Sequence, residues 1–474
     1  MTQGQMLVVD LDGTLIRSDM LFETFWAAFS KTWKAPFVSI ASLLQGRAAL
    51  KHRLQGMGQV EVASLPYNQD VLGYIRQWRA GGGRTALVTA TNQTVAEDIA
   101  AHLGMFDEVH GSDEVTNLKG ANKAAFLQDR FGATGFDYIG DAEADLPVWA
   151  KAHKAIMVGV SGALAAKVAG FGREVEQLPG TEPSVKSYMK ALRPHQWMKN
   201  LLVFLPLLAA HKYDFVSIRD MLMAFVAFSL VASSVYVLND LLDLAADRAH
   251  PRKCRRPFAS GAIPIAHGTV MAPVLLLAGL LVGLPLGWKF LGVIVVYYAI
   301  TTAYSLYFKR QLIIDICVLA VLYTIRIVAG AVAAHIPASV WFLAFSIFFF
   351  FSLAAVKRQA ELIDGISSGR VKASGRGYQT SDLPLVANMA IAAGYVSVLV
   401  MALYVNSPAV LVLYHKPSAL WGICLVLLYW ISRMVMVTHR GQMHDDPVVF
   451  AAKDRVSLLC VALIFGFAAA GVIL

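Results

Sequence analysis

The chain has 474 residues, of which 57% are hydrophobic and only 15% charged, and its mean hydropathy is +0.56. This composition excludes an ordinary soluble globular protein. Formal charge divides unevenly, because residues 1–184 hold 16 Lys and Arg against 20 Asp and Glu, whereas residues 185–474 hold 25 against 12. We therefore expect two bodies of different chemistry, a polar one with net charge −4 and a membrane one with net charge +13.

Neither a disulfide framework nor a cysteine-based zinc site is expected, because the four cysteines lie far apart and all follow residue 184. The N-terminus also lacks the cationic segment and long apolar run of a signal peptide, since its short apolar run over residues 6–9 ends at Asp10. We expect the polar body to stay on the side of the membrane where it is synthesised.

Two carboxylates follow the first predicted strand, in the sequence LVVDLDGTL over residues 7–15. Asp10 and Asp12 are two residues apart, which puts both side chains on one face of an extended chain. One carboxylate can attack a phosphorus atom while its neighbour protonates the leaving oxygen and then activates water, provided that a divalent cation offsets the negative charge. The motif therefore predicts phosphoryl-transfer chemistry.

Two further predicted strands end in polar side chains that suit the same chemistry. Residues 84–91 (RTALVTAT) place Thr89 where a hydroxyl can donate to a phosphoryl oxygen. Residues 138–145 (YIGDAEAD) place Asp141 and Asp145 where carboxylates can ligate Mg²⁺. Strands that alternate with helices predict a parallel α/β sheet, in which ligands bind at the carboxyl ends of the strands.

A lysine precedes the helix that we predict over residues 120–131. Lys119 offers a cation beside a helix N-terminus, and that combination suits an anionic group. Lys123 lies one turn later and is the alternative. Lys119 is favoured because it precedes the helix.

The order of these four motifs resembles that of the haloacid dehalogenase superfamily of phosphatases, over about residues 5–165. The resemblance implies a set of catalytic and substrate-binding residues, namely the nucleophile Asp10, the general acid and base Asp12, and the phosphate ligands Thr89 and Lys119. It also implies a Mg²⁺ site, built from Asp10, Asp12, Asp141 and Asp145.

The same resemblance implies an α/β Rossmann-like haloacid dehalogenase domain over residues 1–180, with a helical cap over about residues 16–75. Six aromatic residues lie in the first part of this cap: Phe22, Phe25, Trp26, Phe29, Trp33 and Phe37. Most simply they form the core of the cap. The alternative is a surface that contacts the bilayer or receives a lipid substrate.

Apolar stretches follow one another from about residue 196, each near the length of about 20 residues that a helix needs to cross a bilayer. Lys and Arg gather on the cytoplasmic side of membrane proteins, and alternate loops here carry twenty of them against four in the remaining loops. The sequence thus predicts an all-α nine-transmembrane-helix bundle over residues 181–474 in the cell inner membrane, with the N-terminal domain cytoplasmic and the C-terminus on the opposite side. The nine predicted spans are 196–210, 217–240, 268–287, 289–307, 312–334, 339–357, 384–405, 417–437 and 455–473.

The second predicted span ends in three aspartates, in the sequence NDLLDLAAD over residues 239–247. Asp240, Asp243 and Asp247 fall within about 60° of one helical face, where they repel one another unless cations lie between them. Carboxylates at the end of a membrane helix are costly and functional by default. Mg²⁺ that joins them to a diphosphate is the physical reason for such an arrangement, and neighbouring basic residues suit the remaining phosphate charge.

The pattern NDxxDxxxD resembles the UbiA-type superfamily of intramembrane polyprenyl transferases, over residues 190–474. Residues 192–200 (LRPHQWMKN) and 247–261 (DRAHPRKCRRPFASG) are most similar to its polyprenyl-phosphate phosphoribosyltransferase branch, which joins phosphoribosyl diphosphate (PRPP) to a lipid phosphate and releases diphosphate. The resemblance implies catalytic and Mg²⁺-binding carboxylates at Asp240, Asp243 and Asp247. It also implies substrate-binding residues, namely Lys199, Asn239, Arg248, Lys253 and Arg256.

Aromatic prenyl transferases carry a second motif, DxxxD, on a later helix, and the sequence has none there. The corresponding stretch, residues 357–364, is KRQAELID. Cations mixed with carboxylates suit a substrate that brings two separate phosphate groups to a lipid phosphate. We therefore add three candidate substrate ligands, Lys357, Arg358 and Glu361.

Two ionisable residues, Asp315 and Arg326, lie in the fifth predicted span about three turns apart. They either pair with polar groups of other helices or contact the substrate. The polar stretch over residues 445–455 is interpreted as a solvated loop, with closure over the site as the alternative.

Together these patterns predict a bifunctional, Mg²⁺-dependent membrane enzyme. It would transfer 5-phosphoribose from PRPP to a polyprenyl phosphate, and its N-terminal domain would hydrolyse a phosphate monoester, by hypothesis the 5-phosphate of the lipid product. The alternatives are an aromatic prenyl transferase whose phosphatase acts on an unrelated soluble phosphate, and one whose N-terminal domain is regulatory and not catalytic. The expected partners are the two substrates and the lipid bilayer; no nucleic acid is expected, and a homo-oligomer stays open.

Overall fold

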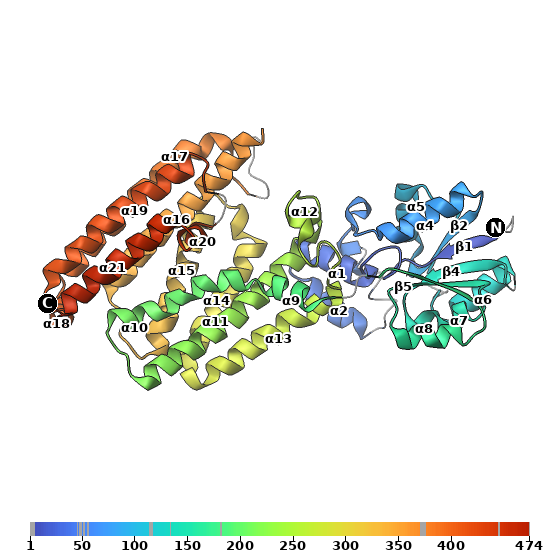
Figure 1. The fold of residues 1–474 in the computed structure, drawn as a ribbon, viewed down its shortest axis with the longest axis horizontal. Helices are drawn as coiled ribbons and strands as arrows, with labels where there is room; N and C mark the ends of the chain where they lie inside the picture. The colour runs from blue at the N-terminus through green and yellow to red at the C-terminus, as the bar shows by residue number, and fades with distance from the viewer. Residues whose placement is uncertain are drawn as a thin grey trace. The chain divides into compact units, whose positions relative to one another are not determined.

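A computed structural model of the chain describes residues 5–44, 46, 50, 53–54, 56–112, 117–132, 134–180, 183–369, 376–443 and 446–473. The chain divides into two compact units, one of Met1–Leu192 and Tyr236–Ala272 and the other of Arg193–Val235 and Pro273–Leu474. Figure 1 shows the elements of both units. The first unit thus combines the N-terminal residues with the segment that carries Asp240, Asp243 and Asp247.

A parallel sheet of six strands, in the order β3-β2-β1-β4-β5-β6, runs through the N-terminal part of the first unit. Figure 1 labels β1, β2, β4 and β5. In the central strand, Val9 lies opposite Leu87 on one side and Ile139 on the other. The predicted α/β class is therefore confirmed. The strands are β1 (Met6–Val9), β2 (Arg84–Asn92), β3 (Glu108–Ser112), β4 (Phe136–Gly140), β5 (Lys154–Val158) and β6 (Glu174–Leu178).

Helices cover both faces of this sheet, so the four residues of β1 are all buried. Because side chains alternate along a strand, Leu7 and Val9 pack against α4 and α5, whereas Met6 and Val8 pack against α6 and α7. The helices of this part are α1 (Met20–Lys31), α2 (Ala35–Leu43), α4 (Gln69–Ala80), α5 (Gln93–Leu103), α6 (Ala121–Phe131), α7 (Leu146–Trp149), α8 (Gly162–Ala169) and α9 (Val185–Leu192).

Eight helices in the described part of the chain are long and apolar enough to cross a membrane. The protein is therefore a multi-pass membrane protein. These helices are α11 (Phe215–Leu242), α13 (Ile265–Gly283), α14 (Trp288–Leu306), α15 (Ile314–Ala333), α16 (Val340–Ser367), α17 (Leu383–Val405), α19 (Trp421–His439) and α21 (Arg455–Ile473). Short helices follow several of them, namely α12 (Leu244–Arg248), α18 (Pro408–Leu413) and α20 (Pro447–Ala451).

The first of the nine predicted spans, residues 196–210, is not a continuous α-helix. A 3₁₀ stretch, Pro194–Phe204, is followed there by the five-residue helix α10 (Leu205–Ala209). Pro194 is the first residue of the 3₁₀ stretch and Pro206 the second residue of α10, and proline removes the N–H that a continuous helix needs. The prediction of nine helices is therefore corrected to eight long helices among the described residues, preceded by this broken segment.

A buried ion pair joins α15 to α16 in the second unit. Arg358 and Asp315 are fully buried, and their N and O atoms are 2.6 Å apart. The Tyr378 hydroxyl donates to Asp315 at 2.7 Å, and Arg358 also pairs with Glu361. Arg326 is likewise held by polar groups from other elements, since it donates to Asn200 at 2.9 Å. The two charged residues of the fifth predicted span are thus paired with other elements, as the structural alternative predicts.

Replacing Asp315 with Asn should leave Arg358 buried beside a neutral amide. Loss of one partner of a buried pair typically costs about 3–5 kcal/mol, so the melting temperature of the purified protein in detergent should fall markedly. Asp220→Asn is the control, because its partner Arg219 is largely exposed and surface pairs contribute about 0–1 kcal/mol. Equal melting temperatures for the two variants would contradict a stabilising role for the buried pair.

Candidate active sites

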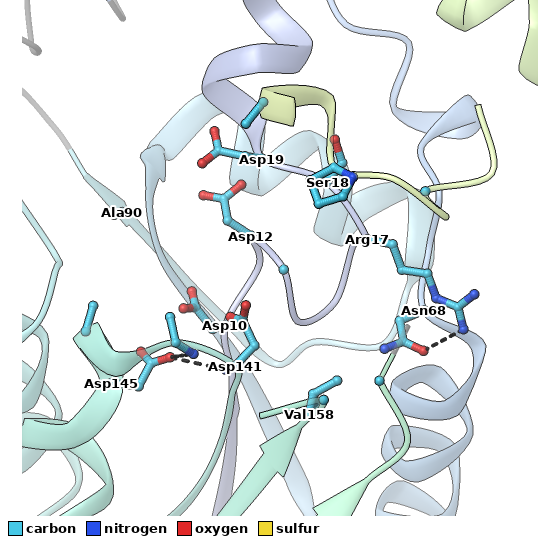
Figure 2. Close-up of a pocket in the computed structure, with 18 of the residues that line it drawn as sticks. Asp10, Asp12, Arg17, Ser18, Asp19, Asn68, Ala90, Asp141, Asp145 and Val158 are labelled. Carbon is cyan, nitrogen blue, oxygen red and sulfur yellow. Dashed lines mark hydrogen bonds between the residues drawn. The ribbon is translucent and has the colours of Figure 1, made fainter. Parts of the chain in front are cut away.

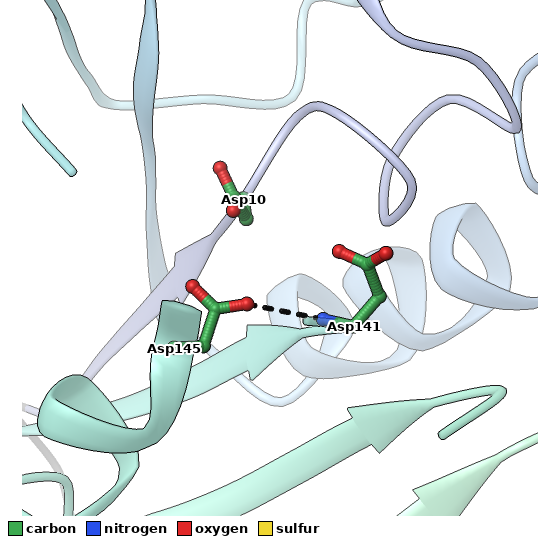
Figure 3. Close-up of side chains that lie close together, drawn as sticks. All are labelled: Asp10, Asp141 and Asp145. Carbon is green, nitrogen blue, oxygen red and sulfur yellow. Dashed lines mark hydrogen bonds between the residues drawn. The ribbon is translucent and has the colours of Figure 1, made fainter. Parts of the chain in front are cut away.

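Two carboxylate motifs of the first unit meet where the strand order reverses. Strands β1 and β4 are neighbours, but the chain continues from β1 toward one edge of the sheet and from β4 toward the other. Connections that leave in opposite directions open a crevice at the carboxyl ends of the strands, where α/β proteins bind ligands. Asp10 follows β1 and Asp141 follows β4, so both lie at this crevice (Figure 3).

Three carboxylates form a candidate cation site at the crevice. One oxygen from each of Asp10, Asp141 and Asp145 lies within 4.8 Å of the others (Figure 3). The N–H groups of Asp141 and Ala142 donate to Asp145 at 3.2 and 3.1 Å and orient its carboxylate. Hard oxygen donors in such a cluster are the ligands that Mg²⁺ prefers, so these side chains fit the predicted ion.

The negative charges of this cluster are crowded and largely buried. Burial, and then the charge of Asp10, raise the pKa of Asp141 to about 8. The same two causes raise the pKa of Asp145. A bound cation would stabilise the ionised forms, so the electrostatics of the cluster favour one.

Gly13 allows the loop after β1 to approach these carboxylates. Its φ is +73°, and a Cβ at this position would lie 2.1 Å from Oδ2 of Asp141. Glycine alone adopts this conformation readily and leaves the necessary space. The next residue, Thr14, uses that approach to donate a hydrogen bond to Asp141 at 3.0 Å.

Asp12 is directed to the start of the cap instead of the three-carboxylate cluster. Its oxygens accept hydrogen bonds from the N–H of Met20 at 2.7 Å and the hydroxyl of Thr91 at 3.1 Å. Burial, and then the charge of the neighbouring Asp19, raise the pKa of Asp12 to about 7 (Figure 2). A carboxyl group that is partly protonated near neutral pH suits the predicted acid and base role. Its predicted share in the Mg²⁺ site is not supported, because its carboxylate is not part of the cluster.

Lys123 contacts the candidate nucleophile directly. Its Nζ lies 2.8 Å from Oδ1 of Asp10 and donates to the hydroxyl of Tyr138 at 3.0 Å. Lys123 is buried on α6, whereas Lys119 precedes that helix, is exposed and lines the cavity wall. The first turn of α6 directs Lys123 inward. Lys123, and not the favoured Lys119, is therefore the lysine that pairs with Asp10.

Thr89 does not line the cavity. It is fully buried, and its hydroxyl oxygen accepts a hydrogen bond from the N–H of Thr91 at 3.0 Å. Strand β2 continues to Asn92, which moves its carboxyl end beyond Thr89. Thr91 is the hydroxyl residue that reaches Asp12, and sequence periodicity cannot separate the two threonines because they share a face of the strand.

A cavity of about 430 Å³ opens beside these residues (Figure 2). Asp10, Asp12, Lys119 and Lys123 line part of it. The segment 236–272 supplies another part of the wall, namely Gly261, Pro264, Ile265 and Ala266. The two parts of the chain to which the sequence assigns separate activities therefore both line this cavity.

A buried ion pair attaches the cap to the segment 236–272. Arg248 binds Glu23 of α1 through two nitrogens, at 2.6 and 3.0 Å, and both side chains are less than 10% exposed. Close by, the indole N–H of Trp26 donates to Thr269 at 2.9 Å. Arg248 was predicted as a phosphate ligand, but its guanidinium is engaged by Glu23, which sequence spacing could not indicate.

The three aspartates of the second predicted span do not share one helical face. Helix α11 ends at Leu242, and Asp243 precedes the new helix α12. Asp240 and Asp247 are brought together by Arg256, whose Nη1 lies 3.0 and 2.5 Å from their oxygens. Among the described residues, Asp243 does not join them in a cluster of metal-ligand spacing.

A cation nevertheless lies between two of the carboxylates, as charge repulsion requires. In this structure that cation is the Arg256 guanidinium, with the exposed Lys253 at 4.0 Å from Asp247. Burial raises the pKa of Asp247 although Arg256 lowers it. Two carboxylates that share one cation are a donor set that also fits a divalent ion. Asn239, at the end of α11, is half-buried next to Asp240 in the sequence.

Asp446 is a buried carboxylate at which two predicted ligands of the second unit meet. Lys199 and Lys357 place their Nζ atoms 2.8 and 2.9 Å from its Oδ2, and the Tyr323 hydroxyl donates to Oδ1 at 3.1 Å. Burial alone would raise the pKa of Asp446, but the charges of Lys357 and Lys199 hold it well below its usual range. The interpretation of this stretch as a solvated loop is therefore wrong for Asp446, because two cations draw it inside.

The other predicted ligands of α16 are turned to different partners. Arg358 is fully buried against Asp315 and has no surface that a substrate could reach. Glu361 is about one-third exposed and pairs with Arg376 at 3.0 Å. Successive residues of an α-helix are rotated by about 100° around its axis, so the adjacent Lys357 and Arg358 point to different sites.

Known families match both parts of the chain. Residues 200–472 match the UbiA prenyltransferase family. The chain belongs to that family. Residues 7–149 match haloacid dehalogenase-like hydrolases, so this UbiA-family protein carries an N-terminal hydrolase domain. The resemblances predicted from the motifs are thus confirmed.

Several relatives share long stretches with this UbiA-family protein. It is 40% identical to the uncharacterized protein y4nM of Sinorhizobium fredii, over 97% of this chain and 89% of that one. It is 36% identical to a decaprenyl-phosphate phosphoribosyltransferase of Mycolicibacterium smegmatis, over 57% of this chain and 88% of that one. A solved UbiA homolog of Archaeoglobus fulgidus, bound to GPP and Mg²⁺, is 14% identical with a TM-score of 0.47, over 60% of this chain and 99% of that one.

The two candidate lysines of the hydrolase domain can be separated by substitution. Lys123→Met should lower the hydrolysis of p-nitrophenyl phosphate by about 100-fold, the typical effect of removing one preorganised donor to a developing anion. Lys119→Met is the matched control and should have the smaller effect, because Lys119 does not pair with Asp10. A larger loss of kcat in Lys119→Met would contradict this assignment.

Proposed function

We propose that this protein transfers 5-phosphoribose from PRPP to a polyprenyl phosphate in its UbiA domain and then removes the 5-phosphate in its hydrolase domain. In the first step, an oxygen of the lipid phosphate attacks C1 of PRPP and diphosphate leaves. The product is a polyprenyl-phosphoryl ribose 5-phosphate. Hydrolysis of its monoester gives polyprenyl-phosphoryl ribose and inorganic phosphate.

Two observations support phosphoribosyl transfer over the transfer of a prenyl group to an aromatic ring. The relative from Mycolicibacterium smegmatis is named a decaprenyl-phosphate phosphoribosyltransferase. In addition, the end of α16 that is predicted to be cytoplasmic carries Lys357 and Glu361, where an aromatic prenyl transferase would carry a second pair of aspartates. A cation there suits a substrate with phosphate groups at both ends of the ribose.

Asp240, Asp243 and Asp247 are the proposed binding site for the diphosphate of PRPP. When bound, Mg²⁺ would offset the charge that develops on the leaving diphosphate. Arg256 already pairs with both Asp240 and Asp247, and a guanidinium can donate two parallel hydrogen bonds to phosphate oxygens. Lys199, Lys357 and Asp446 of the second unit are proposed to bind the lipid phosphate or the ribose 5-phosphate.

In the hydrolase domain, Asp10 is proposed to attack the phosphorus atom of the monoester while Asp12 protonates the ester oxygen of the ribose. The phosphoryl group is then on Asp10, and Asp12, now ionised, takes a proton from the water that releases it. Lys123, next to Asp10, stabilises the anionic oxygens. The cluster of Asp10, Asp141 and Asp145 would hold Mg²⁺, which offsets the charge of the phosphoryl group.

The composition of the hydrolase cavity is the observation that carries the coupling of the two activities. Gly261 and residues 264–266 of the UbiA sequence line the same cavity as Asp10 and Lys123. The segment that holds these wall residues also holds Asp247, fourteen positions before Gly261. A hydrolase for an unrelated soluble phosphate has no need of such a wall. We also propose that both sites act on the cytoplasmic side of the inner membrane, where the basic loops are predicted.

Transfer can be tested with purified protein, Mg²⁺, a polyprenyl phosphate and PRPP labelled in the ribose. The label should appear in the lipid fraction. Asp243→Asn should lower this labelling by about 100-fold or more and leave the hydrolysis of p-nitrophenyl phosphate unchanged. A wild-type protein that labels no lipid, but prenylates an aromatic acceptor, would overturn the assignment.

Coupling can be tested with the substitution Asp10→Asn in the same assay. Lipid should still be labelled, but the product should retain the 5-phosphate, as shown by thin-layer chromatography before and after treatment with an added phosphatase. Asp129→Asn, on the exposed face of α6, is the matched control and should yield the dephosphorylated lipid. An identical dephosphorylated product from Asp10→Asn would refute the coupled order.

A further inference from the structure

Helix α2 of the cap, together with residues just before and after it, presents large apolar side chains outward. Trp33 is 62% exposed, Phe37 66%, Ile40 64% and Leu44 86%. These four residues, here called the cap apolar face, recur at intervals of three or four, which places them on one side of a helical segment. The opposite side of α2 is anchored, because Ala35 packs with Leu50, Leu54 and Ala28.

Five of the six aromatic residues of the cap thus fall into two sets. Trp26 of α1 is buried and Phe25 and Phe29 pack against the small cap core, as a structural role requires. Trp33 and Phe37 instead contact each other edge to face, with ring centres 6.0 Å apart, and remain exposed. Side chains of this size and exposure, gathered on and beside one short helix, indicate a surface that another apolar phase covers.

Charge around the cap apolar face indicates which phase this is. Residues 24–60 contain five Lys and Arg and no Asp or Glu, whereas the rest of residues 1–184 contains eleven against twenty. Lys31, Lys34 and Arg53 are exposed. An apolar strip with cations beside it is complementary to an anionic lipid surface, where the side chains enter the acyl boundary and the cations meet the headgroups.

We propose that the cap apolar face inserts into the anionic surface of a lipid bilayer. The membrane helices of the same chain tether the cap to a bilayer. The cap therefore meets lipid at a high effective concentration, which favours this contact. Helix α2 directly follows α1, whose first N–H, that of Met20, donates to Asp12. Contact with lipid would therefore hold the element that positions the proposed general acid.

The contact can be measured on the full-length protein in nanodiscs of phosphatidylcholine and phosphatidylglycerol. Cys254 and Cys317 are changed to Ser, and Cys424 and Cys460 are left because they are buried. An environment-sensitive fluorophore is then attached at Ile40→Cys or, as the control, at Asp129→Cys on the exposed face of α6.

At position 40 the emission should shift to the blue, lose intensity when the lipids carry brominated acyl chains, and resist quenching by iodide in water. At position 129 the fluorophore should show the reverse. Iodide quenching at position 40 equal to that at position 129 would overturn the proposal. Protection from iodide without quenching by brominated lipid would also overturn it, because a protein surface, such as a second copy, would then cover the face.

A functional consequence rests on the proposed function. Phe37→Glu with Ile40→Glu should lower the hydrolysis of the lipid-linked ribose phosphate and leave that of p-nitrophenyl phosphate unchanged. Ala125→Glu with Gln128→Glu adds the same charge at exposed positions of α6 and should change neither rate. An equal loss of both rates in the first variant would overturn the functional consequence. A wild-type protein that does not hydrolyse the lipid would refute the proposed function alone, since the fluorescence result does not depend on it.

Discussion

Several buried carboxylates of this protein form ion pairs with basic side chains, and the candidate sites depend on those pairs. An ionised carboxylate that leaves water costs several kcal/mol unless a partner of opposite charge and further hydrogen bonds replace the solvent. Most of these pairs join segments that lie far apart in the sequence, so charge compensation also determines which elements lie together. The pairs are Glu23 with Arg248, Asp10 with Lys123, Asp315 with Arg358, Asp240 and Asp247 with Arg256, and Asp446 with Lys199 and Lys357.

These pairs differ in how much they leave for a ligand. Arg358 is fully buried and paired with Asp315, so this ion pair holds two helices together and leaves no exposed cation for a ligand. Arg256 and Lys357 keep about a quarter of their side chains exposed, so a phosphate group can compete for them. Exposure therefore separates Arg358 from Arg256 and Lys357, although all three residues are basic and near acidic motifs in the sequence.

The segment 236–272 connects the two chemistries of the first unit. It contains the aspartates of the UbiA motif, the arginine that pairs with the cap, and part of the wall of the hydrolase cavity. A change that moves this segment would alter both sites. Such sharing is a physical reason for the two domains to be joined in one chain, beyond the convenience of making them together.

Sequence alone determined the α/β class, the family of each half and most of the spans, because these depend on local periodicity and on short motifs. It also placed Asp10, Asp141 and Asp145 at strand ends that parallel topology must bring together. Only the tertiary structure showed that Lys123 and not Lys119 pairs with Asp10, that Thr89 is buried while Thr91 donates to Asp12, and that the helix ends before Asp243. Those outcomes depend on the direction of single side chains and on partners far away in the chain, and neither is encoded in local spacing.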